Sequence, residues 1–148
     1  MDRTNDEIVR EYAAAAAAND LETLTRLRHP EWVTMWPQSG ERVVGNDAFA
    51  AVVEGYPGGK PTMVVDRVVG AEDRWVVSAG NTVVRVSGSG DHWWGAWVMT
   101  YPDGVVYHCI DLIELRDGLV RRETVYWAPP FEAPEWRAPF VDRSDDPA

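Results

Sequence analysis

The chain has 148 residues, of which 45% are hydrophobic, so it is long and apolar enough to fold around a core of its own. Its net charge of −10 disfavours nucleic acid, whose phosphates would be repelled, and no apolar run is long enough to suggest a membrane span. The polar N-terminus does not resemble a signal peptide, and the single cysteine, Cys109, cannot form an intramolecular disulfide. These features indicate a cytoplasmic protein.

The first residues predict two helices. Thr4 and Glu7 match a capping box, and the alanine run over residues 13–18 favours continuation of the helix that the box begins. Asn19-Asp20 interrupts this helix and caps a second one, which has leucines on one side. The second helix is expected to end at His29-Pro30, because the residue before a proline avoids helical geometry.

A short strand and a third helix follow. Residues 32–36 predict the strand, and residues 37–40 form a turn rich in turn-forming side chains. Asn46-Asp47 is expected to cap a helix over residues 48–53, which Gly55 ends.

From residue 63 onward, β-branched and aromatic residues dominate, and turn signals recur at short intervals. The predicted strands are residues 63–70, 74–86, 92–101, 105–115 and 119–128. Helices followed by such a meander predict an α+β fold, in which three N-terminal helices pack on a curved antiparallel sheet. Residues 129–148 hold several prolines together with Phe131, Trp136 and Phe140. We therefore expect an irregular tail that packs on the body of a single domain spanning residues 1–148.

Several stretches resemble a known superfamily. Residues 12–22 read as a helix, small residues, Asp-Leu and a second helix, and residues 109–120 read as a terminal hairpin. Together with the order of elements, they resemble the nuclear transport factor 2-like superfamily. Residues 36–42 and 133–139 resemble uncharacterised actinobacterial members of its SnoaL-like group. The resemblance implies a cystatin-like cone that holds a small apolar ligand and that forms homodimers.

The turns predict how the strands pair. Residues 116–118 suggest a three-residue hairpin loop, and residues 102–104 suggest another. The predicted pairs are Asp111 with Glu123, Cys109 with Val125, Tyr107 with Trp127, Trp97 with Cys109, Gly95 with Asp111, Val83 with Gly95 and Asn81 with Trp97. One face of the sheet would then line an apolar pocket with a small polar cluster.

Two carboxyl groups side by side in a dry pocket cannot both ionise cheaply, so Asp111 and Glu123 are the predicted acid and base. The resemblance implies that Tyr12 joins Asp111 as a hydrogen-bond donor, as in ketosteroid isomerases. Trp36 stands where those isomerases carry the general base, so their mechanism is not expected. The Arg-between-two-Asp cluster of limonene epoxide hydrolases is also absent. The predicted ligand-binding residues are Trp36, Asn81, Trp97, Met99, Tyr107, Cys109, Val125 and Trp127.

Other interpretations stay open for these residues. The two acids would also fit a solvent-facing position or ion pairs with Arg85 or Arg121. Tyr12 also fits a packed helix residue, and Cys109 a small buried hydrophobe. The opposite sheet face is expected to form the dimer interface. Its residues are Trp94, Ala96, Val98, His108, Ile110 and Leu112.

Two functions therefore remain. The first is an acid–base enzyme without cofactor or metal, of isomerase, cyclase, dehydratase or hydrolase type, that acts on a small apolar oxygenated molecule. The second is a non-catalytic small-molecule-binding or dimerisation domain. The histidines are too far apart to predict a metal site. Since members of the superfamily include enzymes and pure binding proteins, the fold alone does not decide between the two.

Overall fold

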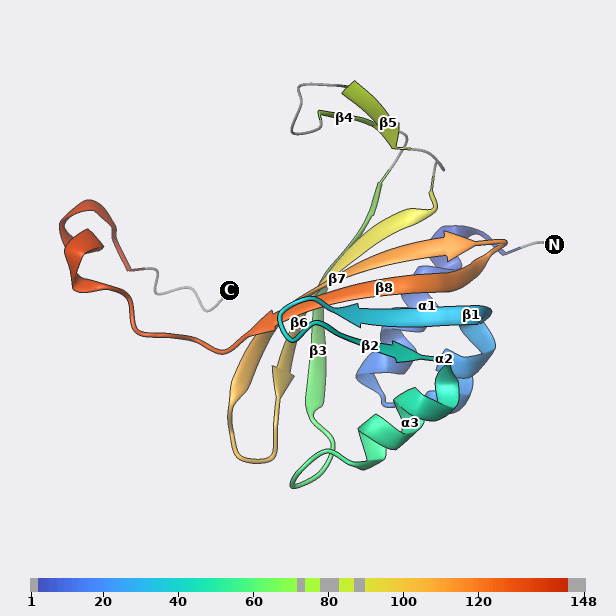
Figure 1. Cartoon of the computed structure of the whole chain (residues 1–148), viewed down its shortest axis with the longest axis horizontal. Coiled ribbons are helices and arrows are strands. Elements are labelled where there is room, and N and C mark those ends of the chain that lie inside the picture. The colour runs from blue at the N-terminus through green and yellow to red at the C-terminus, as the bar shows by residue number, and fades with distance from the viewer. Residues whose placement is uncertain (1–2, 72–73, 78–82, 87–89, 144–148) are drawn as a thin grey trace.

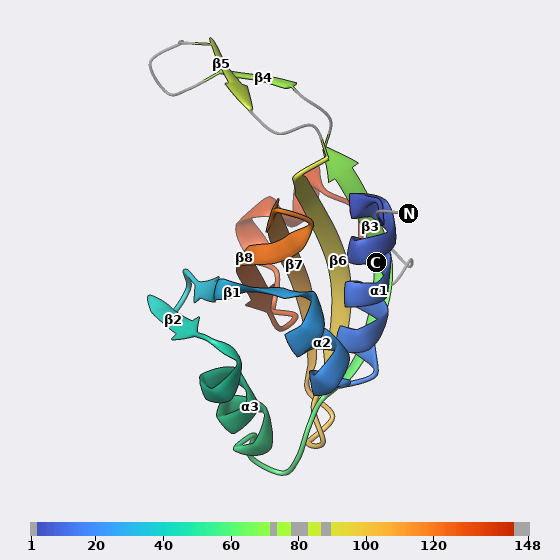
Figure 2. The same ribbon diagram turned by 90° about the vertical axis from the view of Figure 1, so that its right-hand side faces the viewer.

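A computed structural model of the chain describes residues 3–71, 74–77, 83–86 and 90–143. Three N-terminal helices lie on one face of a curved six-stranded sheet, as Figures 1 and 2 show, so the α+β prediction is confirmed. The helices are α1 (Asn5–Ala17), α2 (Leu21–Leu27) and α3 (Asn46–Glu54). The strands of the sheet are β1 (Arg28–Trp36), β2 (Glu41–Val44), β3 (Thr62–Ala71), β6 (His92–Thr100), β7 (Val106–Arg116) and β8 (Leu119–Ala128).

The helix caps agree with the sequence at α1 and α2. Thr4 Oγ1 accepts from the Glu7 amide, and the Glu7 carboxylate accepts from the Thr4 amide at 2.8 Å, which completes the capping box. Asp20 caps α2 by accepting from the Thr23 amide. At α3 the N-cap is Gly45, and no side chain caps the helix, so the predicted cap at residues 46–47 is wrong.

The strand order in the sheet is β2-β1-β8-β7-β6-β3. All neighbours run antiparallel except β1 and β8, which run parallel. This parallel pair places the strand that follows α2 beside the last strand of the meander. The N-terminal part of the chain therefore contributes side chains to the same cavity face as β8.

The predicted strand over residues 74–86 is instead a hairpin of β4 (Arg74–Val77) and β5 (Val83–Val86), which forms a separate two-stranded sheet (Figure 1). Residues 78–82, between these two strands, lie outside the described residues. The strand β3 takes the place beside β6, where Gly95 pairs with Val68 and Trp97 with Val65. The predicted pairing of β6 with residues 81–83 is therefore wrong, and Asn81 itself lies outside the described residues.

The β6–β7 pairing agrees with the prediction, since Trp97 pairs with Cys109 and Gly95 with Asp111. The β7–β8 pairing does not. Asp111 pairs with Val125 and Cys109 with Trp127, so the predicted partners are two residues out.

The cause is the turn between β7 and β8. Asp117 and Gly118 both have positive φ, 53° and 71°, which gives a two-residue turn of type I′ rather than a three-residue loop. A bulge then leaves Arg121 unpaired between the pairs Leu115–Val120 and Glu114–Arg122. Turn and bulge together shift the register by two residues, and because side chains alternate, an even shift keeps each residue on its predicted face.

The C-terminal tail differs from the prediction. Beyond β8 the chain leaves the sheet and ends in a short 3₁₀ helix, η1 (Glu135–Phe140), away from the body (Figure 1). Phe131, Trp136 and Phe140 are 77%, 75% and 80% exposed, so these aromatic side chains of the described part of the tail do not pack on the body. Pro129 and the proline after it lack the amide hydrogens that would extend the β8 ladder, which ends the strand there.

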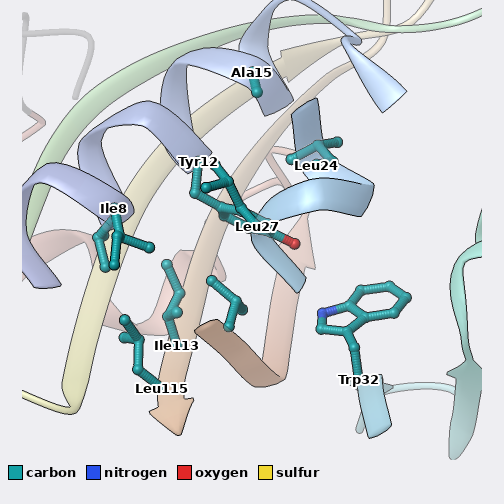
Figure 3. Packing of buried hydrophobic residues seen from close by; sticks show 10 residues of the cluster. Ile8, Tyr12, Ala15, Leu24, Leu27, Trp32, Ile113 and Leu115 are labelled. Carbon is teal, nitrogen blue, oxygen red and sulfur yellow. The ribbon is translucent and has the colours of Figure 1, made fainter. Parts of the chain in front are cut away.

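The main core lies between α1, α2 and the sheet (Figure 3). Ile8 and Leu24 from the helices meet Ile113 and Leu115 from β7. In Figure 3 the Tyr12 hydroxyl and the Trp32 indole nitrogen point toward a common space at the edge of this core. No helix within the described ranges is both long and apolar enough to cross a membrane.

Candidate functional site

A cavity of about 210 Å³ lies between the helices and the concave face of the sheet. Alternate residues of β1, β6, β7 and β8 form its floor, and α1, α2 and α3 form its roof. The sequence-predicted residues in its wall are Tyr12, Trp36, Trp97, Met99, Cys109, Asp111, Glu123, Val125 and Trp127. The alternation of the strands thus brings eight of these residues to one site, where Tyr12 joins them from α1.

Glu123 is the centre of a buried polar network. Its Oε2 accepts hydrogen bonds from the Tyr12 hydroxyl at 2.7 Å and from Trp32 Nε1 at 2.8 Å. The carboxyl group of Glu123 thus fills the space that Tyr12 and Trp32 face in Figure 3. An oxygen that accepts from two donors suits an ionised carboxylate, which offers acceptors only.

Arg28 supplies the positive charge of this network. Its Nη2 lies 3.9 Å from Glu123 Oε2, and its Nε donates to the Tyr12 hydroxyl at 2.7 Å. The guanidinium group stacks 3.6 Å above the Trp32 ring centroid and 4.3 Å from that of Phe49. Arg28 is 6% exposed, so a charge is held in the protein interior by one carboxylate and by aromatic faces.

Asp111 lies diagonally across the β7–β8 pair from Glu123, on the same face. Burial raises the pKa of Asp111 well above its ordinary value. The negative charge of Glu123 and a hydrogen bond with it raise the pKa further, and Arg28 opposes them. Asp111 is therefore the member of the pair that holds the proton, and its Oδ1 has no hydrogen-bond partner.

The Tyr12 hydroxyl is not available to donate a hydrogen bond to a ligand, as the resemblance implies that it would be. Its hydroxyl donates to Glu123 and accepts from Arg28, so its one hydrogen is already engaged. Burial, followed by the charge of Glu123, raises the pKa of Tyr12 well above its ordinary value. The residue therefore serves as a fixed donor that holds Glu123.

Cys109 is buried in the cavity wall, and burial raises the pKa of its thiol to about 11, with a smaller contribution from Asp111. A thiol that keeps its proton is a poor nucleophile. This environment fits the interpretation of Cys109 as a small buried hydrophobe.

Some of the aromatic residues that were predicted to line the pocket lie in the cavity wall, and one does not. Trp36 and Trp127 both line the cavity, with their rings edge to face and 5.5 Å between centroids. Tyr107 is outside the cavity wall, because its ring packs 5.3 Å from that of Tyr101, which takes the lining position instead. Asn81 lies outside the described residues, so its contact with a ligand stays a prediction.

Sequence reasoning missed several residues of the site. Arg28 is the most important, since it is the buried cation beside Glu123, whereas the sequence predicts only the end of a helix there. Strand alternation gives no signal for it, because the pairing of β1 with β8 shifts register between Arg28 and Val33. The other missed wall residues are Ala16, Asn19, Leu21, Leu24, Thr34, Phe49, Val52, Val53, Tyr56, Pro61, Met63 and Tyr101.

Cofactor binding has few candidate residues. Within the described ranges, no three histidine, cysteine or acidic side chains gather in a way that would hold a metal ion. The polar groups of the cavity suit hydrogen bonding and proton transfer, and its remaining wall suits an apolar ligand.

Comparison with known proteins agrees with this architecture. Residues 9–123 match the family model of the SnoaL-like domain. No protein with a curated function matches the chain. A nuclear transport factor 2-like protein of unknown function from Burkholderia xenovorans is 28% identical over 95% of this chain and 94% of its own, with a TM-score of 0.67.

Two further solved structures share the fold. A putative ketosteroid isomerase from Kribbella flavida has a TM-score of 0.74 at 21% identity, covering 97% of this chain and 91% of its own. Bal32a, from a soil-derived mobile gene cassette, has a TM-score of 0.62 at 22% identity, covering 83% of this chain and 88% of its own. At these identities the likeness concerns the fold alone.

Proposed function

Because the chain belongs to the SnoaL-like domain family of nuclear transport factor 2-like proteins, we propose that it is a cofactor-independent acid–base enzyme for a small apolar oxygenated molecule. The reaction would be of isomerase, cyclase, dehydratase or hydrolase type. One observation carries the proposal: Asp111 is a buried carboxyl group with a raised pKa and an unpartnered oxygen, in the wall of an apolar cavity.

The acid pair supplies the chemistry. Asp111 and Glu123 share one proton, so the pair can release a proton to a substrate oxygen or take one from the substrate. Glu123 is held in place by Tyr12 and Trp32 and is balanced by the charge of Arg28. An ionised Asp111 beside this fixed negative charge is costly, which makes it a stronger base than an ordinary aspartate.

The test is proton exchange in D₂O, followed by NMR, on flat ketones and hydroxy ketones such as 1-indanone, 2-tetralone and 3-hydroxy-1-indanone. We expect the wild-type protein to exchange protons next to the carbonyl group, or to eliminate water from the hydroxy ketone, faster than buffer. Asp111→Asn keeps the shape of the side chain but carries no transferable acid proton, so its rate should fall by about 10²-fold or more. An unchanged rate in Asp111→Asn would exclude Asp111 as the acid.

The hydrogen bonds that Glu123 already accepts favour a second function, the binding of a ligand without catalysis. This carboxylate and the Tyr12 hydroxyl are already tied to each other and to Arg28, and Trp36 stands where the resemblance implies a base. A protein that only binds a ligand needs no free base. Binding of the same ketones without proton exchange would support this non-catalytic alternative.

We also propose that two chains associate through the sheet face opposite the helices. On that face Ile110, Leu112 and Tyr126 are 40%, 44% and 46% exposed in the single chain, and exposed apolar patches of this kind mark interfaces. Light scattering at micromolar concentration should therefore give twice the chain mass of 16.6 kDa. Replacing Ile110 and Leu112 together by lysine should shift the mass to that of one chain, whereas a monomeric wild-type protein would contradict the proposal.

A further inference from the structure

Two polar atoms in the cavity wall stand out from the rest. Among the side chains that the structure describes, Trp97 Nε1 and Asp111 Oδ1 are the buried polar atoms that lack a hydrogen-bond partner. Trp97 is 7% exposed and Asp111 is 5% exposed, and both line the cavity. A buried polar atom left unpaired costs about 1–3 kcal/mol, so a pair of them in one cavity indicates a position for a polar group of a ligand.

Gly95 relates the positions of the two side chains. This glycine pairs with Asp111 across the β6–β7 ladder. A Cβ atom added at Gly95 would lie 2.7 Å from Trp97 Nε1, so the indole folds back along its own strand and covers the glycine. Side chains at paired positions are roughly 5 Å apart at Cβ. The indole N–H therefore occupies the place that a side chain opposite Asp111 would have.

The hydrogen-bonding character of the two atoms differs. An indole N–H can only donate. Burial and the charge of Glu123 raise the pKa of Asp111 and so favour its protonated form, which has one O–H donor and one acceptor oxygen. The free oxygen, Oδ1, is then an acceptor. The same part of the cavity wall thus offers one donor and one acceptor.

We propose that the cavity anchors its substrate by a hydroxyl group, which donates to Asp111 Oδ1 and accepts from Trp97 Nε1. A ketone oxygen would satisfy the indole N–H but leave the carboxyl oxygen unpaired. A carboxylate would meet the negative charge of Glu123, which disfavours it. This inference rests on the proposed function and narrows its substrate class to apolar alcohols, including those that carry a carbonyl group elsewhere.

The test compares three probes of one shape: indane, 1-indanone and 1-indanol. Each is titrated into ¹⁵N-labelled full-length protein, and dissociation constants are taken from NMR shifts. We expect 1-indanol to bind at least about fivefold more tightly than 1-indanone, which corresponds to one additional net hydrogen bond of about 1 kcal/mol. The indole N–H signal of Trp97 should move with the alcohol and the ketone but much less with indane.

Substitutions show whether the preference for the alcohol comes from the proposed hydrogen bonds or from packing against the ring. Trp97→Phe removes the donor and should lower the affinity for 1-indanol about fivefold, with a much smaller effect on indane. Trp93→Phe is the matched control on the same strand, because the Trp93 N–H is already bonded to the Gly90 carbonyl at 2.6 Å, and it should keep the preference for the alcohol. Gly95→Ala displaces the indole and tests the anchor independently, in case Trp97→Phe does not fold.

The outcomes distinguish the two proposals. Equal affinities for 1-indanol and 1-indanone in the wild-type protein, or an unchanged preference in both Trp97→Phe and Gly95→Ala, would overturn the hydroxyl anchor and leave the acid–base function in place. If none of the three probes binds at millimolar concentration, both the anchor and the proposed ligand class are wrong.

Discussion

Replacing Glu123 with glutamine should lower the free energy of unfolding by roughly 3–5 kcal/mol, because it leaves the buried charge of Arg28 without its carboxylate. Glutamine is close in shape and can still accept from Tyr12 and Trp32, so packing changes little. The loss should therefore come from the charge. Thermal or denaturant unfolding monitored by circular dichroism measures it directly.

The same substitution at Glu114 is the matched control. Glu114 lies on the same hairpin and pairs with Arg122 at 3.7 Å, but both side chains are about half exposed, so only about 0–1 kcal/mol is expected there. Adding Arg28→Met to Glu123→Gln removes the stranded charge and should restore much of the stability. If Glu123→Gln melts at or above the wild-type temperature, Arg28 does not depend on Glu123.

Replacing Asp111 with asparagine should raise the free energy of unfolding instead of lowering it, by an amount that depends on pH. The pKa of Asp111 is raised in the folded protein, whereas an unfolded aspartate has a pKa near 4. Between those two values the folded state holds a proton that the unfolded state has released. Stability should therefore fall as the pH rises through this window, by up to about 1.4 kcal/mol per pH unit, and the contribution is fully present only below pH 4.

Asp111→Asn removes this dependence, because asparagine has no proton to lose. The variant should gain stability relative to wild type as the pH rises from 4 toward neutral. Melting curves at unit steps of pH measure the difference, and Asp117→Asn in the exposed turn controls for the same chemical change. A difference that stays constant with pH would mean that Asp111 ionises in the fold as it does in water.

The helices and the cavity face could be predicted because their signals are local. The capping box at Thr4 and the cap at Asp20 depend on residues within one turn, and strand alternation assigns a face from any correct starting point. The pairing of β7 with β8 could not be predicted in the same way. The turn at Asp117 also fits a longer loop, and nothing in the sequence marks the bulge at Arg121.

The partner of the acid pair was predicted incorrectly for a related reason. The sequence offers Arg85 and Arg121 as partners, whereas the observed partner, Arg28, comes from the junction of α2 and β1. It reaches Glu123 only because β1 runs parallel to β8, so that Thr34 lies beside Glu123. Parallel pairing between strands distant in sequence leaves no local pattern, so the buried cation became visible only with the tertiary structure.

The bulge in β8 also determines where this hairpin can lose a residue in evolution. Deletion of Arg121 would remove the bulge and leave Arg122 opposite Glu114, so Glu123 and every later residue would keep its partner and its face. Deletion of one residue between Glu123 and Trp127 has no bulge to absorb it, and it would turn Trp127 out of the cavity and Tyr126 into it. Relatives that keep the acid couple can therefore lack one residue at the bulge, whereas a single gap further along β8 would mark a relative with a different cavity wall.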